Sequence, residues 1–464
     1  MSSDNLGIGG LNISKDEITS HAFDLFSPVN IDTSIIDSTV ITVRPINSTD
    51  SGGPFEFVIP ADEKKWTACE TLRLSGRVKL VKITTAAGVD TESNLGAKDD
   101  ISTCNNFYHS LFRNVSVKLN GTELSDPTGK WYPYKAYLET LLSYGHDTKE
   151  GRLAANGWYK DVAGTFNTFP IIDATTNNIT SDTANEGYKS RRSKFALSAW
   201  AYFTINLHTD LTTLTRNLPP GIKLEINLER TDDAFTILSG SAPNKSIGIK
   251  IEDLEMKVRR YTPNDKIQNH YFTTLAKRGF ASIPIDRSLI KVSTVKSGTS
   301  DLSVLNVIRG AALPDQILAV MIEETAYNGV YNKNPFMFSD NGFVEASLVV
   351  NGIHEPKNLY RAEVSTGNYY QLYSDFLENT GISLEDRDLW IKPDDYVGGC
   401  FILAFDRNFD KCNRYHRHVP SSGIIDLNLR VKTPIDHTMS VLLYATYSSD
   451  LVIDKDYRVS VERF

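Results

Sequence analysis

The chain has few cysteines and no long apolar run. Its 464 residues include only four cysteines, Cys69, Cys104, Cys400 and Cys412. Four are too few for a disulfide framework, so we expect buried, reduced thiols. The longest apolar stretch, residues 317–322, has the length of a strand and is far too short to span a membrane. Residues 1–7 contain neither a basic segment nor an apolar core, so we expect no signal peptide.

An excess of positive charge is also lacking. Lysine and arginine number 49 against 57 aspartate and glutamate residues, for a formal net charge of −8. A protein that binds nucleic acid directly needs a basic face to neutralise phosphates, so this class is disfavoured. Hydrophobic residues make up 41% of the chain and charged residues 23%. This balance predicts a globular protein with buried cores and length enough for two or three domains.

The common catalytic motifs are missing. No Gly-x-Ser-x-Gly elbow occurs, and Gly129-Lys130 is followed by Trp131 rather than by the serine or threonine of a phosphate-binding loop. No Gly-x-Gly-x-x-Gly follows a predicted strand. The sequence therefore predicts no catalytic residue and no cofactor site.

Alternating apolar and polar residues are the dominant pattern. Leu72, Leu74, Val78 and Leu80 alternate with arginine, serine and lysine, and the same period of two recurs along both halves. The further alternating segments are 115–119, 224–228, 247–258 (with a phase slip at Glu252-Asp253 that indicates a bulge), 348–350, 425–431 and 441–445. This is the pattern of antiparallel strands with one face buried, so we predict an all-β fold of sandwiches.

One segment occurs twice. Residues 112–121 align without gaps on residues 343–352, with Phe, Ser, Asn and Gly at identical positions. Each copy ends in Asn-Gly, at 120–121 and at 351–352, which is the strongest short signal for a hairpin turn. A short helical pattern rich in aromatic residues follows each copy, at 134–142 and at 370–377. In this alignment Tyr134, Tyr137 and Leu141 correspond to Tyr370, Tyr373 and Leu377.

The repeat predicts two tandem antiparallel sandwiches of about 200 residues each. We expect an N-terminal segment at 1–50, a first domain at 51–262 and a second at 263–464. A third helix, at 264–277 with Asn264 as its N-cap, would join the two domains. The polar segments 84–100 and 173–190 are expected to be exposed loops.

Charged clusters are candidates for contacts between subunits. The sharpest basic run is Lys189, Ser190, Arg191, Arg192, Ser193 and Lys194. We interpret it as a solvated loop, although anionic lipid, nucleic acid or an acidic loop of a neighbour could bind it. His416, Arg417 and His418 form a second positive cluster, and the pairs Asp99-Asp100 and Asp394-Asp395 are candidate negative partners.

One group could bind a metal ion. Asp410, Cys412, His416 and His418 lie close in sequence, and alternate residues on a strand point to one face. Because no second cysteine pair supports a zinc site, we interpret the group as a basic cluster with Arg414, and we predict no metal. The acidic pair Glu323-Glu324 would face opposite sides of a strand, which disfavours a shared catalytic site. The aromatic residues 131–144 could form a carbohydrate-binding surface but more often fill a core or an interface.

Several strings resemble the capsid proteins of Polinton (Maverick) elements and adintoviruses. The closest are NNFYHSLF (105–112), VSVKLNG (115–121), YPYKAYLETLLSYG (132–145), WYKD (158–161), FDLF (23–26) and TSI (33–35). In the second half the resemblance is looser and rests on residues 349–352 and the closing segment 441–461. It implies the double jelly-roll fold of the adenovirus and tectivirus lineage and trimers of pseudo-hexagonal outline. The family supplies no catalytic residues.

These observations together predict a viral structural protein. We expect a major capsid, hexon-like protein whose homotrimers form pseudo-hexameric capsomers of an icosahedral shell in the virion, assembled inside the host cell. Its partners would be neighbouring capsomers and minor capsid or penton proteins. Two other classes stay open: a tandem β-sandwich module for carbohydrate binding or adhesion, and a β-sandwich enzyme.

Overall fold

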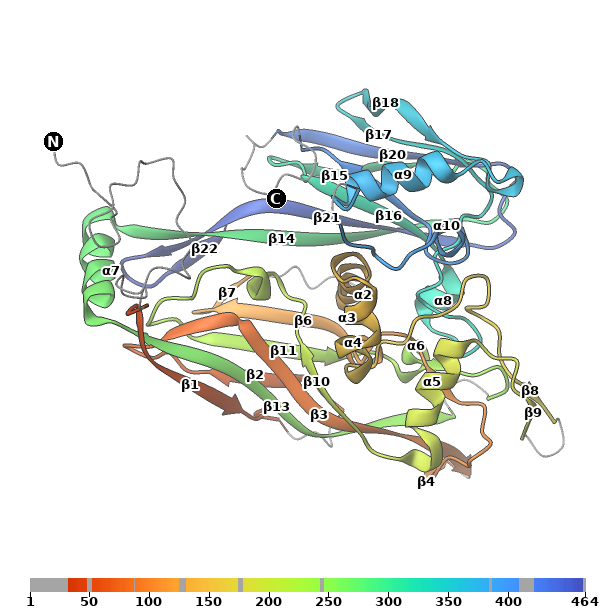
Figure 1. The fold of residues 1–464 in the computed structure, drawn as a ribbon, viewed down its shortest axis with the longest axis horizontal. Helices are drawn as coiled ribbons and strands as arrows, with labels where there is room; N and C mark the ends of the chain where they lie inside the picture. Colours follow the sequence, from red (N-terminus) through yellow and green to blue (C-terminus); the bar gives the residue numbers. More distant parts are fainter. Residues whose placement is uncertain are drawn as a thin grey trace, which may run out of the picture.

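The computed structural model describes residues 32–47, 52–86, 88–124, 131–173, 178–242, 246–383, 386–408 and 421–461. Two β-sandwiches lie one above the other, and short helices fill the space between them (Figure 1). The fold is mostly antiparallel sheet, as the alternating pattern predicts.

The first half forms a sandwich of two sheets. One sheet has the strand order β1-β13-β3-β10 and the other the order β2-β11-β6-β7. All pairings within them are antiparallel. The bounds are β1 Ile35–Val43, β2 Phe55–Ile59, β3 Trp66–Ala86, β6 Phe112–Leu119, β7 Thr122–Glu123, β10 Ala201–Asn206, β11 Leu224–Arg230 and β13 Ile247–Pro263.

The second half repeats this connectivity. Its sheets have the orders β14-β21-β16-β19 and β15-β20-β17-β18. The bounds are β14 Phe280–Val295, β15 Val304–Gly310, β16 Gln316–Glu323, β17 Phe343–Val350, β18 Ile353–Arg361, β19 Ile402–Asp406, β20 Gly423–Val431 and β21 Met439–Asp454. If the eight strands of either half are counted in chain order, both halves give one sheet ordered 1-8-3-6 and one ordered 2-7-4-5. This is the connectivity of a jelly roll, so the prediction of two tandem jelly rolls is confirmed.

Shorter elements complete the fold. The additional strands are β4 Val89–Ser93, β5 Ser102–Thr103, β8 Ile171–Ile172, β9 Ile179–Ser181, β12 Ile237–Leu238 and β22 Val459–Val461. The helices are α1 Phe107–Ser110, α2 Trp131–Ser143, α3 His146–Glu150, α4 Arg152–Ala155, α5 Glu186–Lys194, α6 Asp233–Thr236, α7 Asp265–Arg278, α8 Glu324–Asn328, α9 Tyr370–Asn379 and α10 Pro393–Val397. Short 3-10 turns occur at Ala196–Ser198, Asp210–Thr213 and Val364–Thr366.

The two Asn-Gly turns have the same geometry. Asn120 and Asn351 have φ of 46° and 51°, and the glycines after them have φ of 85° and 84°. Two successive positive φ values make a tight two-residue hairpin, which joins β6 to β7 and β17 to β18. Each asparagine Oδ1 also accepts a bond from the backbone of the adjacent strand, from Lys223 N at 2.7 Å and from Ile424 N at 3.0 Å. The repeated turn is therefore confirmed down to its side-chain hydrogen bonds.

Helix α7 joins the two rolls at one end of the molecule (Figure 1). Asn264 caps it by accepting a bond from Lys266 N at 3.0 Å, as the sequence predicts, and Gly279 ends it with φ of 84°. Strand β1, which precedes residue 50, pairs along its length with β13. Residues 35–43 therefore belong to the first roll, and the expected boundary at 50 lies too late in the chain.

Two expectations about local structure differ from the model and one is confirmed. Residues 84–100 are not a plain loop, because β3 continues to Ala86 and pairs back with the exposed strand β4. Residues 186–194 form helix α5 rather than a loop. The expected bulge is present: the register of β13 against β3 shifts between Glu252 and Glu255, and Asp253 has φ of 54°.

Each roll buries the apolar side of its strands. Leu72, Leu74, Val78 and Leu80 of β3 are fully buried, whereas Arg73 between them is exposed. Three cysteines, Cys69, Cys104 and Cys400, are buried free thiols, and Cys412 lies outside the described residues. Within the part of the chain that the model describes, no helix has both the length and the hydropathy that crossing a membrane requires.

Candidate functional site: the junction between the two rolls

Helix α2 lies in the junction between the two rolls, together with α3 and α4 (Figure 1). It follows β7, the fifth strand of the first roll, and its sequence is apolar on nearly every side. Such a helix is stable only where protein surrounds it. Tyr132, Tyr134 and Tyr137 are accordingly buried, so they are not displayed as a carbohydrate-binding surface.

Aromatic rings connect α2 to the second roll. The Tyr137 ring stacks on Phe336 with centroids 4.2 Å apart and an interplanar angle of 6°. The Tyr134 ring stacks on Tyr327 at 5.7 Å and meets Phe336 edge-on at 5.6 Å. Phe336 and Tyr327 belong to the segment between β16 and β17. Because each such pair contributes about 0.5–1.5 kcal/mol beyond its buried area, this packing holds the rolls in one relative position.

A buried ionic network also crosses the junction. The Lys135 side chain is 2% exposed, and its Nζ lies 2.6 Å from Asp210 Oδ1 and 3.1 Å from Glu139 Oε1. Lys135 also donates to Ser288 Oγ on β14, and Ser288 donates to Asp210 Oδ1 at 2.8 Å. Tyr444 on β21 donates its hydroxyl to Glu139 Oε1 at 2.9 Å. Hydroxyl groups of the second roll thus supply part of the hydrogen bonds that one ammonium and two carboxylates of the first roll need.

The network shifts the pKa values of its members. Burial alone would raise the pKa of Glu139, but Lys135 and the hydrogen bond from His208 outweigh it and lower the pKa to about 2. Burial would lower the pKa of Lys135, but the carboxylates of Asp210 and Glu139 raise it above its usual value. Burial, and then the neighbouring His208, lowers the pKa of His109 well below its usual value. Lys135 and Glu139 are therefore charged at neutral pH, and His109 is neutral.

Two further lysines reach from the first roll to the second. Lys160 Nζ pairs with Asp395 Oδ2 at 2.6 Å. Lys149 is buried on α3, and its Nζ donates to the backbone carbonyls of Leu141 at 2.7 Å and Leu389 at 2.6 Å. Burial lowers the pKa of Lys149 to about 7, because both of these partners are uncharged carbonyls.

The predicted basic run lies on helix α5, which buries one of its cations, rather than in a solvated loop. Arg191 on α5 is buried, and its Nη2 lies 2.8 Å from Asp161 Oδ1. Arg192 pairs with Asp182 at 2.5 Å, and Lys189 pairs with Glu186 at 2.8 Å. The interpretation of residues 189–194 as a solvated loop is therefore wrong, since three of the four cations in the run are paired inside the chain.

The predicted acidic pairs also have partners within the chain. Asp100 accepts bonds from Tyr188 Oη at 2.5 Å and from the backbone of Gly240 at 2.9 Å, while Asp99 pairs with Lys82 at 2.7 Å. In the second acidic pair, Asp395 binds Lys160 and Asp394 accepts a bond from the Tyr369 hydroxyl at 3.3 Å. These groups therefore stabilise the subunit itself.

The candidate metal group lies outside the described residues. Asp410, Cys412, Arg414, His416, Arg417 and His418 all fall in the segment 409–420. Within the described ranges, no cluster of three or more His, Cys, Asp or Glu side chains could hold a metal ion. Glu323 and Glu324 do not share a site, because Glu323 ends β16 and pairs with Lys333 at 2.9 Å whereas Glu324 begins α8.

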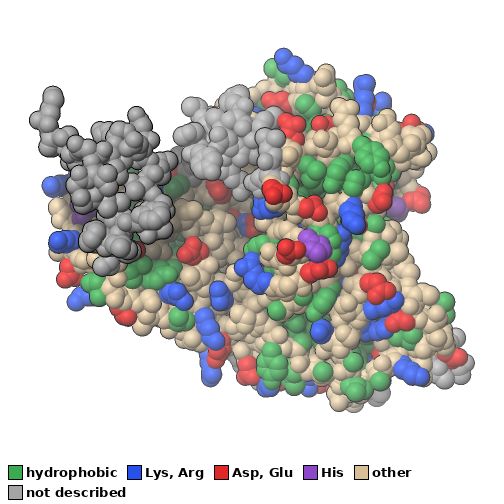
Figure 2. Space-filling model, in the orientation of Figure 1, with side chains coloured by type: hydrophobic (Ala, Val, Ile, Leu, Met, Phe, Trp, Pro, Cys, Tyr) green, Lys and Arg blue, Asp and Glu red, His purple; other side chains and the backbone are tan. Residues whose placement is uncertain are grey.

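The surface carries mixed charge. Lysine and arginine side chains are interspersed with aspartate and glutamate over the described part of the visible face, and neither sign dominates it (Figure 2). A field of one sign, which a nucleic-acid groove would need, is not present among the described residues of this face.

Comparisons with known proteins were made by sequence and by structure. No protein-family model matches the chain. An uncharacterised protein of Caenorhabditis elegans, F54H12.2, is 21% identical over 347 residues, which cover 74% of this chain and 76% of the nematode protein.

The structural comparison extends over almost the whole chain. A chain in the cryo-EM structure of the Sputnik virophage superposes with a TM-score of 0.61 at 12% identity and covers 99% of this chain and 94% of its own length. The Faustovirus major capsid protein gives a TM-score of 0.56 at 10% identity, covering 92% of each chain. The mavirus major capsid protein gives 0.51 at 12% identity, covering 97% of this chain and 96% of its own. At such low identity the likeness concerns the fold, which is the double jelly roll common to these structures.

Proposed function

We propose that this protein is a viral major capsid protein without enzymatic activity, located in the shell of the virion and assembled inside the host cell. The observation that carries the proposal is the eight-strand connectivity that occurs twice in one chain. Its likeness to the Faustovirus and mavirus major capsid proteins extends over at least 92% of the chain and supports the same role.

The double roll suits a hexagonal shell. Three copies of a subunit with two similar lobes form a ring of six similar lobes, so a trimer can occupy a six-fold position in a lattice. We infer that the functional unit is such a homotrimer, with neighbouring capsomers and minor capsid or penton proteins as further partners. This arrangement needs the two lobes in a fixed relation, and the buried rings and ions of the junction supply it.

Within this class we propose the lineage of Polinton elements and adintoviruses. The support is the set of strings in the first half that resemble their capsid proteins, among them residues 105–112 and 132–145.

The test is the size and shape of the purified protein. We expect particles with the mass of three chains in light scattering after gel filtration, and capsomers of pseudo-hexagonal outline in negative-stain micrographs. Contacts within the trimer should persist from low to high salt, because large apolar interfaces are not screened, whereas contacts between trimers should weaken. Monomers under all conditions would contradict the proposal, as would trimers that dissociate while larger assemblies persist.

A further inference from the structure

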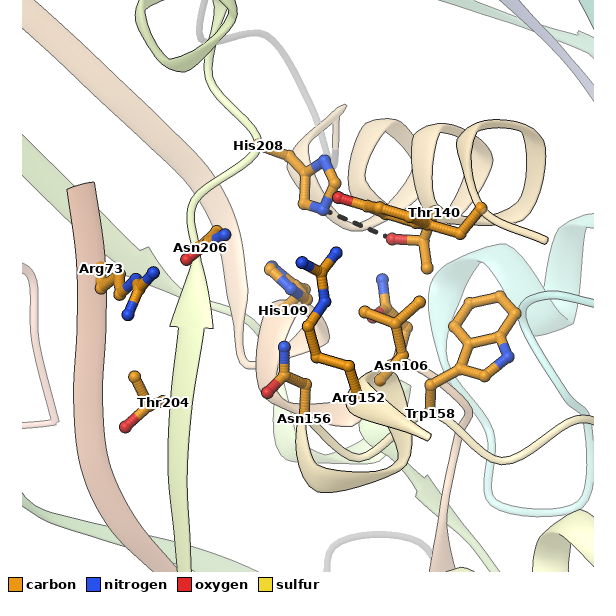
Figure 3. A pocket seen from close by; sticks show the side chains of 12 residues that line it. Arg73, Asn106, His109, Thr140, Arg152, Asn156, Trp158, Thr204, Asn206 and His208 are labelled. Carbon is orange, nitrogen blue, oxygen red and sulfur yellow. Dashed lines mark hydrogen bonds between the residues drawn. The ribbon is translucent and has the colours of Figure 1, made fainter. Parts of the chain in front are cut away.

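A second feature of the first roll is a small polar pocket beside the junction. It has a volume of about 170 Å³ and lies between β3 and β10 on one side and α1, α2 and α4 on the other (Figure 3). Every polar side chain that lines it can donate a hydrogen bond, and no carboxylate of the described residues is among them. The lining is therefore rich in donors and carries positive charge.

One buried donor of the lining is unsatisfied. Asn106 precedes α1 in a left-handed conformation with φ of 55°, and it is only 3% exposed. Among the residues that the structure describes, none accepts a hydrogen bond from its side-chain Nδ2. Figure 3 shows this side chain among those of Arg152, His109 and Thr140. A buried amide donor without an acceptor is unfavourable, so this atom indicates an acceptor bound in the pocket.

Two arginines are among the lining residues of the pocket. Arg73 comes from β3 and Arg152 from α4. Neither forms an ion pair with any other residue of the described ranges, whereas most other arginines of this roll do. Arg152 Cζ lies 5.3 Å from the centroid of the Tyr144 ring, and a cation–π contact of this kind uses none of the N–H groups as hydrogen-bond donors to an oxyanion.

A neutral histidine adds a further donor. The backbone N–H of His208 donates to the Tyr132 oxygen at 3.4 Å, and the Tyr132 hydroxyl lies 2.9 Å from Nδ1 of His109. With the hydroxyl proton donated to Nδ1, the proton of the neutral His109 ring is assigned to Nε2. This ring lines the pocket, so it offers an N–H without bringing a charge.

From this geometry we infer that the pocket binds a small tetrahedral oxyanion of the phosphate type. Sites for drug-sized molecules have volumes of roughly 300–1,000 Å³, so a pocket of about 170 Å³ suits an ion with a few waters. Guanidinium forks bind oxyanions through paired N–H groups. The lining donors come from strands β3 and β10 and from helices α1, α2 and α4, and donors from several elements suit a tetrahedral ion better than a planar carboxylate.

The bound ion would stabilise the subunit. It would connect Arg152 on α4 to Arg73 on β3, two elements far apart in the sequence. His208, which also lines the pocket, bonds through Nδ1 to Glu139 of the ionic network at 2.7 Å. Bound phosphate should therefore raise the melting temperature of the protein, since a ligand that binds only the folded state stabilises it.

The experiment is titration calorimetry of the full-length protein with inorganic phosphate, in sodium chloride of matched ionic strength. We expect one saturable site per chain. Arg152→Gln, at an exposed position, should raise the dissociation constant at least tenfold. Asn106→Asp keeps the shape of the side chain but replaces the donor by a charged acceptor, so binding should be lost. Arg361→Gln, on β18 of the second roll with a side chain 72% exposed, is the matched control and should bind phosphate like the parent.

Other anions identify the source of the ligand. If adenosine monophosphate binds as tightly as phosphate, the natural ligand is an esterified phosphate. If only inorganic phosphate binds, the natural ligand is the free ion. Both outcomes support the oxyanion site. Absence of saturable phosphate binding would overturn it, and so would acetate that binds equally well. Unchanged affinity in Arg152→Gln would also overturn it, and this variant decides the matter if Asn106→Asp does not fold.

Discussion

Replacing Phe336 by alanine tests whether the aromatic junction holds the two rolls together. Phe336 is fully buried, stacks on Tyr137 and meets Tyr134 and Phe235 edge-on at 5.6 and 6.1 Å. Two of these rings belong to α2 and the third to α6, all in the first roll, whereas Phe336 belongs to the second. The substitution therefore removes one side chain from several contacts between rolls and leaves both sandwich cores intact.

The expected loss of stability follows from the size of the side chain. Truncating a buried phenylalanine to alanine costs about 3–5 kcal/mol, which includes the cavity that remains. Ring pairs add about 0.5–1.5 kcal/mol each beyond buried area, and Phe336 forms three of them. We expect a loss near the upper end, about 5 kcal/mol, because the stacked Tyr137 cannot collapse into the space while α2 is held on its other sides.

The assay is denaturant unfolding at one fixed protein concentration, followed by two spectroscopic probes. The matched control is Phe55→Ala, which removes an equally buried ring with one ring partner, Phe112, inside the first roll. Phe55→Ala should lower the midpoint of unfolding and keep the two rolls cooperative. Phe336→Ala should lower it as much or more and separate the unfolding of the two rolls into two transitions. A loss below about 1 kcal/mol with a single transition would refute the role given to the junction, since a buried phenylalanine in a packed core costs about 3 kcal/mol or more.

Five other substitutions test the ionic network, the titration of two buried groups, and the turns. Lys135→Met should destabilise the protein by about 3–5 kcal/mol, measured by denaturant unfolding, because it leaves two buried carboxylates without their cation. Glu139 contributes stability above its unfolded pKa of about 4.3, and this is lost as the pH falls toward about 2, so Glu139→Gln should flatten the acid limb of a stability–pH curve. The pKa of Lys149 is also lowered in the folded state, so its effect has the same sign at higher pH. The unfolded state binds its proton more tightly between pH 7 and about 10.4, so stability rises with pH there and Lys149→Met should remove the rise. Gly121→Ala and Gly352→Ala, at φ of 85° and 84° with open space around each, should both cost about 1–2 kcal/mol in melting experiments, and unequal costs would contradict the equivalence of the turns.

Local patterns in the sequence were enough to predict the strands and turns. Alternation places Leu72 and Leu74 inside because side chains on a strand alternate between two faces, and this needs no knowledge of distant residues. Asn-Gly is equally local, since few other pairs accept two positive φ values. The repeat of such local signals, at 112–121 and 343–352, then predicted that the fold is doubled.

Charged residues were predicted poorly because their partners are distant in sequence. Arg191 stands in a run of cations, yet it is buried against Asp161, which lies 30 residues earlier. A run of charge ordinarily indicates a solvated surface, and only the tertiary fold shows that one member points inward. The ionic network was missed for the same reason, although a signal existed: Lys135 and Glu139 are spaced i, i+4 in a helix that is otherwise apolar.

The equivalence of the two aromatic helices is only partial. Both α2 and α9 follow the fifth strand of their roll, so they occupy the same place in the connectivity. Tyr134 is fully buried, whereas Tyr370, its counterpart in the sequence alignment, is 61% exposed. Sequence similarity thus placed the helices correctly but could not show that only α2 meets a second roll within the same chain.

This difference between α2 and α9 leads to a prediction about assembly. In a ring of six lobes each roll has a neighbour on both sides, and α2 meets the second roll of its own chain. In the proposed trimer, the same pseudo-symmetry predicts that the side of the second roll that carries α9 faces the first roll of the next chain. The exposed Tyr370, stacked on Tyr369 at 4.9 Å, would be covered there.

Tyr370→Ala should therefore weaken the trimer and leave the folded subunit intact. Large aromatic side chains at the centre of an interface contribute about 2 kcal/mol or more, which corresponds to a dissociation constant raised roughly thirtyfold. Sedimentation equilibrium measures this constant, and circular dichroism checks that the fold is retained. Tyr370→Phe keeps the ring and should keep the trimer, which separates loss of ring packing from loss of the hydroxyl. If Tyr370→Ala leaves the dissociation constant of the trimer unchanged, the α9 side of the second roll lies outside the interface between subunits. The pseudo-symmetric arrangement of the ring would then be wrong.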